Sequence, residues 1–429
     1  MMFAVTLPVL LTAVGAAIDY SRAVNARSAM QAAVDATALM ISKEASSLNP
    51  EEITTKAHAY FNALYTHSEV ADVSFNATYT PNAGNGASVE VIASGSVQTD
   101  FMKFASITDM PINVASTTKW GNIRYRIALA LDNTGSMSSA SKMEELKKAA
   151  NKLIGDFYDM ATTNEDVYIS IVPFARDVNI GTDKKDANWI RWTEWDNDNK
   201  KKVCTKSQYT TKRKCEDNGG TWNTVTAPHT DWNGCVMDRD QDFDTTNTPP
   251  DPAVTATMIP AWQSEACPTA MIGMTSVKAS KQTLLDKISA MRPNGSTNQG
   301  IGMFWAWLTH ANAGPFPTPS KDSTYVYQDV IILLTDGLNT ENRYDGDGRN
   351  HSTRVDARQA LLCTNARAQG IKIFAIQVAT DRDPVSTVTK NCASEPDNPN
   401  YFSHITQASQ MTVKFQNIFK ELAKLRVAK

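Results

Sequence analysis

The chain has 429 residues, a hydrophobic fraction of 42% and a formal net charge of -3 at pH 7. This length exceeds that of one small domain and predicts two or three folded units. Lysines and arginines are scattered along a nearly neutral chain, which excludes a global basic field. We therefore expect no nucleic-acid partner.

The first 18 residues, MMFAVTLPVLLTAVGAAI, contain no charged side chain. A membrane-spanning helix needs about 17–25 apolar residues, and an apolar stripe at helical spacing continues from Ala23 to Ile41. We therefore expect an uncleaved transmembrane anchor at residues 1–19. A cleaved signal peptide and a buried helix are the alternatives, although the former lacks a basic segment before the apolar run.

The orientation of this anchor is left open by two opposing signals. Arg22 and Arg27 follow the apolar run, and the positive-inside rule places such residues in the cytoplasm. Disulfide bonds, which the cysteines below favour, require an oxidising compartment instead. A basic segment upstream of Met1 would reconcile the two, and the upstream reading frame tests that hypothesis.

Residues 20–120 have the pattern of a small unit made of helix and sheet. A helix is predicted from Glu51 to about Tyr65, after Asn49-Pro50. Alternating apolar and polar residues predict strands at 73–79 and 88–91, and a third is expected at 112–117. The stretch from Pro81 to Gly86 is typical of a turn. No residue in this region has a catalytic pattern.

From Arg124 onward, short apolar strands alternate with amphipathic helices, which is the pattern of a parallel α/β sheet. Ser141 and Glu144 have the spacing of a capping box at the start of a helix near Lys142. The predicted strands are 127–131, 167–172, 330–334 and 371–378, and the further helices are 284–291, 301–311, 357–369 and 411–427. We expect one α/β domain at 124–429.

A polar stretch rich in Trp and Cys interrupts this domain at about 180–277. It is too long for a bare loop, so we interpret it as an insertion. The six cysteines lack the spacing of a zinc site. Disulfides are the favoured interpretation and six free thiols the alternative, with 15 pairings open. The candidates are Cys204, Cys215, Cys235, Cys267, Cys363 and Cys392.

Four aspartates alternate within the insertion, at Asp238, Asp240, Asp242 and Asp244. A calcium loop of the EF-hand type would need a glutamate at its twelfth position, where Pro249 stands. We therefore interpret this stretch as a solvated acidic loop.

Two apolar strands each end at an aspartate, Asp132 in LALD and Asp336 in LLTDG. Ligands gather at the carboxyl ends of strands in open parallel sheets, so we expect both side chains in one crevice. Asp132, Thr134 and Ser136 alternate in a tight loop that can direct three oxygens at one point. Carboxylates and hydroxyls suit Mg²⁺, Mn²⁺ or Ca²⁺ rather than zinc or copper.

These motifs resemble those of von Willebrand factor A (VWA) domains. DNTGS at 132–136 is similar to the family's DxSxS motif, with Thr134 replacing the first serine; GSTN at 295–298 is similar to its threonine loop and LLTDG at 333–337 to its second aspartate. The resemblance implies a Rossmann-like, mostly parallel sheet with helices on both faces.

The resemblance to VWA domains also implies a metal-ion-dependent adhesion site (MIDAS) in which Thr134, Ser136 and Thr297 ligate the cation. Asp132 and Asp336 would bind directly or through water, and one open position would accept an acidic side chain of a partner protein. The alternative is a metal-free VWA scaffold in which these are capping and turn residues.

The segment AAIDYSRAVNARSAMQAAVDATAL at 16–39 resembles the N-terminal segment of TadG-type proteins of Flp (tight adherence) pilus assembly, as does WNGCVMDR at 232–239. The resemblance implies a TadE/TadG-like unit at 20–120 behind a single-pass anchor in a bacterial inner membrane. The bulk of the chain would face the periplasm or the cell surface. It implies a non-enzymatic protein whose partner is a pilus or cell-envelope component.

Two other function classes remain as alternatives. One is a secreted VWA adhesin that binds host matrix or carbohydrate. The other is a metal-dependent hydrolase that uses the cation as a Lewis acid. The hydrolase would need a general base beside the metal, and no histidine or spare carboxylate has the spacing for that role.

Overall fold

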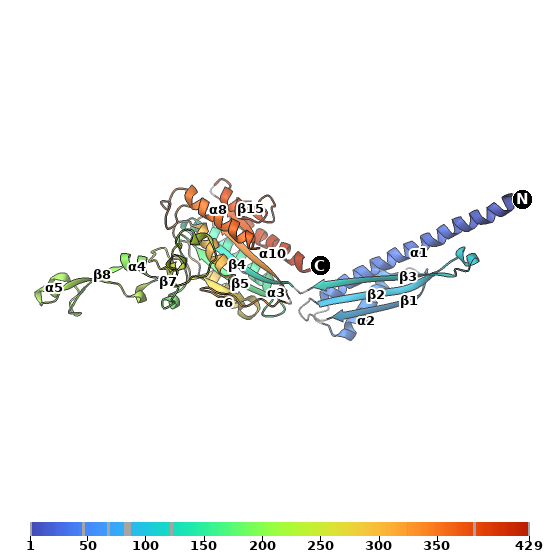
Figure 1. Cartoon of the computed structure of the whole chain (residues 1–429), viewed down its shortest axis with the longest axis horizontal. Helices are drawn as coiled ribbons and strands as arrows, with labels where there is room; N and C mark the ends of the chain where they lie inside the picture. Colours follow the sequence, from blue (N-terminus) through green and yellow to red (C-terminus); the bar gives the residue numbers. More distant parts are fainter. Residues whose placement is uncertain are drawn as a thin grey trace. The chain divides into compact units, whose positions relative to one another are not determined.

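The computed structural model describes residues 2–44, 48–66, 69–80, 87–120, 123–323, 325–380 and 383–427 (Figure 1). The chain divides into two compact units. Unit 1 comprises residues 1–123 with the short segments 322–326 and 424–429, and unit 2 comprises residues 124–321 and 327–423. Each unit has its own hydrophobic core.

Unit 1 is a three-stranded antiparallel sheet packed against two helices. Its apolar stripe from Ala23 to Ile41 is buried against the sheet, because residues at helical spacing share one face. The elements are α1 (Met2–Glu44), α2 (Pro50–Leu64), β1 (Val70–Thr80), β2 (Ala87–Gln98), η2 (Met102–Ala105) and β3 (Asp109–Trp120). The predicted second helix and three strands are confirmed, and the predicted turn at 81–86 lies outside the described residues.

Helix α1 continues through the segment that the sequence predicts to be a membrane anchor. The side chains of residues 1–13, which form most of the apolar run, lie outside the described residues. Among the helices that the structure describes, none combines the length and the apolar character that a bilayer span requires. The anchor at 1–19 therefore stays a prediction.

Unit 2 is built on an eight-stranded mixed sheet whose strands run in the order β10-β6-β5-β4-β13-β14-β15, with β12 also paired to β5. Parallel pairs join β5 to β4, β13 to β14 and β14 to β15. The bounds are β4 (Ile123–Asp132), β5 (Val167–Phe174), β6 (Val178–Asn179), β10 (Cys235–Val236), β12 (Ile272–Ser276), β13 (Val326–Thr335), β14 (Lys372–Val378) and β15 (Phe402–Ile405). The four predicted strands are present, and β6, β10 and β12 add antiparallel edges that the sequence did not predict.

Helices cover both faces of this sheet, as the alternation of side chains along β4 shows. Ala128 and Ala130 share a core cluster with α7 and α8, so Ile127 and Leu129 point to the opposite face. Tyr125, on that opposite face, packs with its ring tilted against that of Phe157 of α3 and donates its hydroxyl hydrogen to a backbone carbonyl of α10. The helices are α3 (Lys142–Met160), α6 (Val277–Ala290), α7 (Gln299–Leu308), α8 (Thr353–Ala368), α9 (Thr387–Cys392) and α10 (Met411–Val427).

The predicted insertion packs against the sheet through its tryptophans. Trp195 and Trp232 are fully buried and belong to the same cluster as Trp305 and Trp307 of α7. Its elements include β7 (Ile190–Arg191), α4 (Thr193–Asp198), β8 (Lys200–Cys204), α5 (Lys212–Asp217), β9 (Trp222–Thr226) and β11 (Ile259–Pro260). In Figure 1, β8, α5 and β9 extend from the rest of unit 2 as a green arm. The insertion is therefore held by a shared apolar core as well as by disulfides.

The prediction of a solvated acidic loop is wrong for three of the four alternating aspartates, whereas Asp242 is exposed as predicted. Asp240 accepts hydrogen bonds from both Arg191 and Arg343, and Asp244 pairs with Arg358 of α8. Asp238 is half-buried, and both of its carboxylate oxygens accept from the Asn298 side-chain amide. Arginines that are distant in the sequence supply the partners, so local spacing could not reveal them.

The predicted disulfides are confirmed, and the structure selects one pairing. Cys204 joins Cys215, Cys235 joins Cys267, and Cys363 joins Cys392, which leaves no free cysteine. The first pair closes the arm between β8 and α5. The second ties β10 to the segment before β12. The third links α8 to α9 within the buried core of unit 2.

We predict that the core and arm disulfides differ in their effect on stability. Replacing Cys363 and Cys392 together by serine should lower the free energy of unfolding of unit 2 by about 2–4 kcal/mol, because the bond restricts the unfolded chain and both sulfurs are buried. The matched pair Cys204→Ser and Cys215→Ser should leave the main urea transition unchanged and only increase proteolysis of the arm. Equal losses in the main transition would contradict this assignment.

Candidate metal centre

Asp132 and Asp336 stand at the carboxyl ends of two neighbouring strands. Asp132 is the last residue of β4, Asp336 follows the last residue of β13, and these strands are adjacent in the sheet. Both side chains are buried, with 0% and 1% of their surfaces exposed. The backbone N–H of Asp336 lies 3.4 Å from Asp132 Oδ2, so the two carboxylates share one crevice, as the sequence predicts.

The loop after β4 brings two hydroxyls to these carboxylates. Thr134 donates from its backbone N–H and its hydroxyl to Asp132 Oδ1, at 2.8 and 2.5 Å. Its Oγ1 lies 3.0 Å from Ser136 Oγ, which in turn donates to Asp336 Oδ1 at 2.6 Å. A continuous chain of oxygen atoms therefore joins four of the five predicted residues. Ser136 is exposed, so the cluster opens to solvent on its side.

The fifth predicted residue, Thr297, is placed beside this cluster by its loop. Gly135 N–H donates to the Gly295 carbonyl at 2.9 Å, and Asn294 N–H donates to the Asn133 carbonyl at 2.8 Å. These bonds join the threonine loop to the DNTGS loop. Gly295 has a φ of 89°, a left-handed conformation that favours glycine.

A buried network of amides fixes the far side of the threonine loop. Gln299, the first residue of α7, receives a hydrogen bond from Gln359 of α8 at 3.0 Å, and Asn339 donates to Gln359 at 2.6 Å. Asn339 in turn accepts from the backbone N–H of Gln299 at 2.8 Å. A buried polar network whose members are all hydrogen-bonded holds the chain in one arrangement. Because Gln299 lies two residues after Thr297, this network restricts the position of Thr297.

Lys142 is a component of the centre that the sequence reasoning missed. Its ammonium donates to Asp336 Oδ2 at 2.9 Å, and both side chains are buried. Lys142 is the first residue of α3, where the helix dipole disfavours a cation. The predicted capping box is also wrong, because Ser141 is left-handed with a φ of 55° and its side chain does not cap α3. A lysine at the first position of a predicted helix, where the helix dipole disfavours a positive charge, was the sequence signal that could have indicated this role of Lys142.

A second missed residue, Thr335, supports Asp132 from the other side. Its hydroxyl donates to Asp132 Oδ2 at 2.7 Å. Even with these donors, burial and, secondarily, the negative charge of Asp336 raise the pKa of Asp132 to about 7. Two carboxylates close together out of water repel each other, and a bound cation relieves this repulsion.

The donor set of this centre fits a hard divalent cation. It offers carboxylate and hydroxyl oxygens, the ligands that Mg²⁺, Mn²⁺ and Ca²⁺ prefer. Within the described part of the chain, no group of three or more His, Cys, Asp or Glu side chains could hold a metal. The proposed site is not a group of that kind, because it has only two carboxylates and its other protein ligands are hydroxyls.

Comparison with a family model gives one local match. Residues 1–40 match the Tad family, described as Flp pilus-assembly TadE/G-like. The match covers α1 and none of the metal-centre residues. No curated protein matches the chain.

Several solved structures are similar to this chain at low identity. The pilus adhesin SpaC from Lactobacillus rhamnosus GG matches at 11% identity and a TM-score of 0.40, over 84% of this chain and 36% of that one. The vWF domain of the type V pili tip protein Mfa5 from Porphyromonas gingivalis matches at 10% identity and a TM-score of 0.38, over 72% and 98%. The chain thus spans about a third of the length of SpaC.

We predict that Gly295→Ala disturbs the centre through the backbone. A Cβ at this position would lie 3.1 Å from the Cβ atoms of Ala175 and Ala266, in a conformation that side chains rarely adopt. The free energy of unfolding should fall by about 1–3 kcal/mol, as measured by urea denaturation. Gly155→Ala in α3 is the matched control, since nothing lies within 4 Å of the added Cβ. It should stabilise the protein by about 0.5–1 kcal/mol, and an unchanged Gly295→Ala would contradict the assigned strain.

Proposed function

We propose that residues 124–429 form a VWA domain that holds a divalent cation in a MIDAS and uses it to bind an acidic side chain of a partner protein. The cation's ligands come from Asp132, Thr134, Ser136, Thr297 and Asp336. The supporting observation is the convergence of oxygen atoms from the ends of β4 and β13 beside the threonine loop. Mg²⁺ is the first candidate, with Mn²⁺ or Ca²⁺ as alternatives.

The charges at the centre favour an acidic partner group. Asp132 and Asp336 carry two negative charges when ionised, and Lys142 carries one positive charge. Binding of a divalent cation leaves the centre with one positive charge in a largely buried setting. Such an excess is costly unless an anion compensates it. A carboxylate of the partner would supply that anion, and exposed Ser136 lies where it can approach.

We further propose that the chain is a component of Flp pilus assembly in a bacterial cell envelope. The family match at residues 1–40 supports this assignment, and three disulfides support an oxidising compartment. In this proposal an N-terminal anchor at 1–19 lies in the inner membrane, and the bulk of the chain faces the periplasm or the cell surface. The partner is then a pilus or envelope protein, and no catalytic step is assigned to the chain.

We predict that Asp132→Ala abolishes binding of the cation and preserves the fold. Titration calorimetry with Mn²⁺ should show saturable binding to the unmodified chain and none to the variant, because the variant removes a carboxylate that holds the other ligands. Far-UV circular dichroism should be unchanged. Asp159→Asn, an exposed position on α3, is the matched control and should bind Mn²⁺ normally.

The partner is tested with the same two variants. A pull-down from the native membrane should recover it with the unmodified chain and with Asp159→Asn in Mg²⁺, and should lose it with chelator or with Asp132→Ala. Unchanged Mn²⁺ binding by Asp132→Ala would refute the metal centre. A partner that survives both the chelator and the variant would refute its role in adhesion.

We predict that Lys142→Met makes folding more dependent on the metal. Loss of one member of a buried ion pair costs about 3–5 kcal/mol, so Tm should fall in chelator. Mn²⁺ should restore more stability to this variant than to the unmodified chain, because the metal then compensates the charge of Asp336 that Lys142 no longer compensates. The control is Lys148→Met, an exposed position on the same helix. An equal Mn²⁺-dependent shift of Tm in both variants would contradict the role of Lys142.

A further inference from the structure

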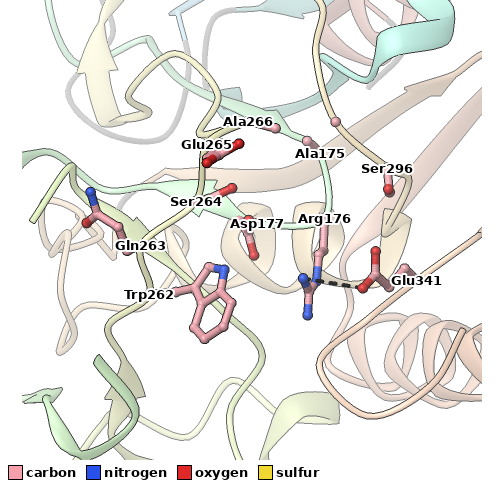
Figure 2. A pocket seen from close by; sticks show the side chains of 11 residues that line it. Ala175, Arg176, Asp177, Trp262, Gln263, Ser264, Glu265, Ala266, Ser296 and Glu341 are labelled. Carbon is pink, nitrogen blue, oxygen red and sulfur yellow. Dashed lines mark ion pairs between the residues drawn. The ribbon is translucent and has the colours of Figure 1, made fainter. Parts of the chain in front are cut away.

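A small pocket is lined in part by the residues that precede Thr297, a proposed metal ligand. Figure 2 shows its lining side chains. It has a volume of about 270 Å³. One wall is formed by Gly295 and Ser296, which directly precede Thr297, and by Glu341, whose backbone N–H lies 3.3 Å from the Thr297 carbonyl. A group in the pocket is therefore next to the loop that carries a metal ligand.

The one arginine that lines the pocket is already engaged. Arg176 pairs with Glu341 at 3.3 Å, the contact drawn as a dashed line in Figure 2. Its guanidinium also lies over the ring of Trp262, 5.5 Å from the centroid. The charge of Arg176 is thus neutralised by Glu341 within the pocket. The Arg176 guanidinium group covers one face of the Trp262 indole. An anion gains little here, and a sugar ring lacks that face for stacking.

Two further carboxylates give the pocket an excess of negative charge. Glu265 is exposed on its rim, and Asp177 lies buried in its wall with 2% of its surface exposed. The carboxylate of Asp177 hydrogen-bonds with the side chain of Ser264, yet its Oδ1 atom has no partner within the described part of the chain. Burial raises the pKa of Asp177 to about 6. An incompletely satisfied buried carboxylate is costly, and a positive charge in the adjacent pocket would stabilise its ionised form.

We propose that this pocket binds a cationic side chain, a lysine ammonium or an arginine guanidinium, from the partner whose acidic side chain the metal centre takes. The pocket is smaller than most sites for whole small molecules, which have volumes of roughly 300–1,000 Å³, and suits one side chain. The identity of the partner rests on the proposed function, whereas the charge preference of the pocket does not. The partner therefore presents an acidic and a basic residue close together.

The charge preference is tested without metal, using the full chain in chelator. The probe is N-acetyl-lysine methylamide, and N-acetyl-norleucine methylamide is the matched compound that lacks the ammonium group. Binding is followed through the indole N–H resonance of Trp262, assigned with Trp262→Phe. The lysine probe should shift this resonance saturably, and the norleucine compound should not.

Variants then locate the binding charge. Asp177→Asn should weaken binding of the lysine probe by at least about tenfold, as expected for loss of a nearby buried negative charge. Glu265→Gln, which is exposed and preserves the fold, should weaken it by a smaller factor. Asp186→Asn, an exposed position away from the pocket, should have no effect. Equal binding of both compounds, no binding of the lysine probe, or unchanged affinity in both Asp177→Asn and Glu265→Gln would overturn the proposal.

A second experiment separates the pocket from the metal centre. Acetylated and amidated peptides carry one aspartate and one lysine, separated by one to four glycines, and are titrated in Mn²⁺. At one spacing the affinity should exceed that of the peptide with norleucine in place of lysine by at least about tenfold, through the effective concentration of linked groups. Asp132→Ala should remove the contribution of the aspartate alone, and Asp177→Asn that of the lysine alone. If the aspartate contributes nothing and the lysine does contribute, the proposed metal centre is refuted and the pocket proposal is supported. If the lysine contributes nothing at any spacing, the pocket proposal is refuted.

Discussion

The repulsion between two buried carboxylates is the constraint around which unit 2 is organised. Asp132 ends β4 and Asp336 follows β13, and the residues just before them, 127–131 and 330–334, are buried and apolar. The sheet therefore holds both carboxylates out of water at one edge. Hydroxyls of Thr134, Ser136 and Thr335 donate to them, and Lys142 supplies one positive charge. The remaining negative charge supports the proposal that this edge holds a cation.

Rigid surroundings keep these oxygen atoms together. The threonine loop is bonded to the DNTGS loop by two backbone hydrogen bonds and is supported from α7 and α8 by a buried amide network. The insertion contributes to the same framework, because Asp238 accepts from Asn298, the N-cap residue of α7. Elements far apart in the chain thus restrict one small loop, and this restriction favours a pre-organised site over one that forms on binding.

The pocket beside the threonine loop connects the insertion to the proposed binding function. Trp262, Ser264 and Glu265 come from the insertion, whereas Arg176 and Asp177 directly follow β5. In the two proposals above, the metal centre binds an anionic side chain and the pocket binds a cationic one, so that together they would recognise a pair of opposite charges. Such a pair of subsites gives more specificity than a metal ion alone, since an acidic side chain is common on protein surfaces.

The sequence alone determined the main strands and helices, and it supplied the residues that are proposed to hold a metal. Apolar strands ending in aspartate, the DNTGS loop and the helical stripe of α1 are local patterns, and local patterns report which face of an element is buried. Only the tertiary structure decided which cysteines pair, that Lys142 neutralises Asp336, and that the alternating aspartates pair with Arg191, Arg343 and Arg358. These contacts join residues tens to hundreds of positions apart, or oppose a local preference as Lys142 does at the start of α3. Spacing along the chain carries no record of them, because they exist only once the sheet brings distant segments together.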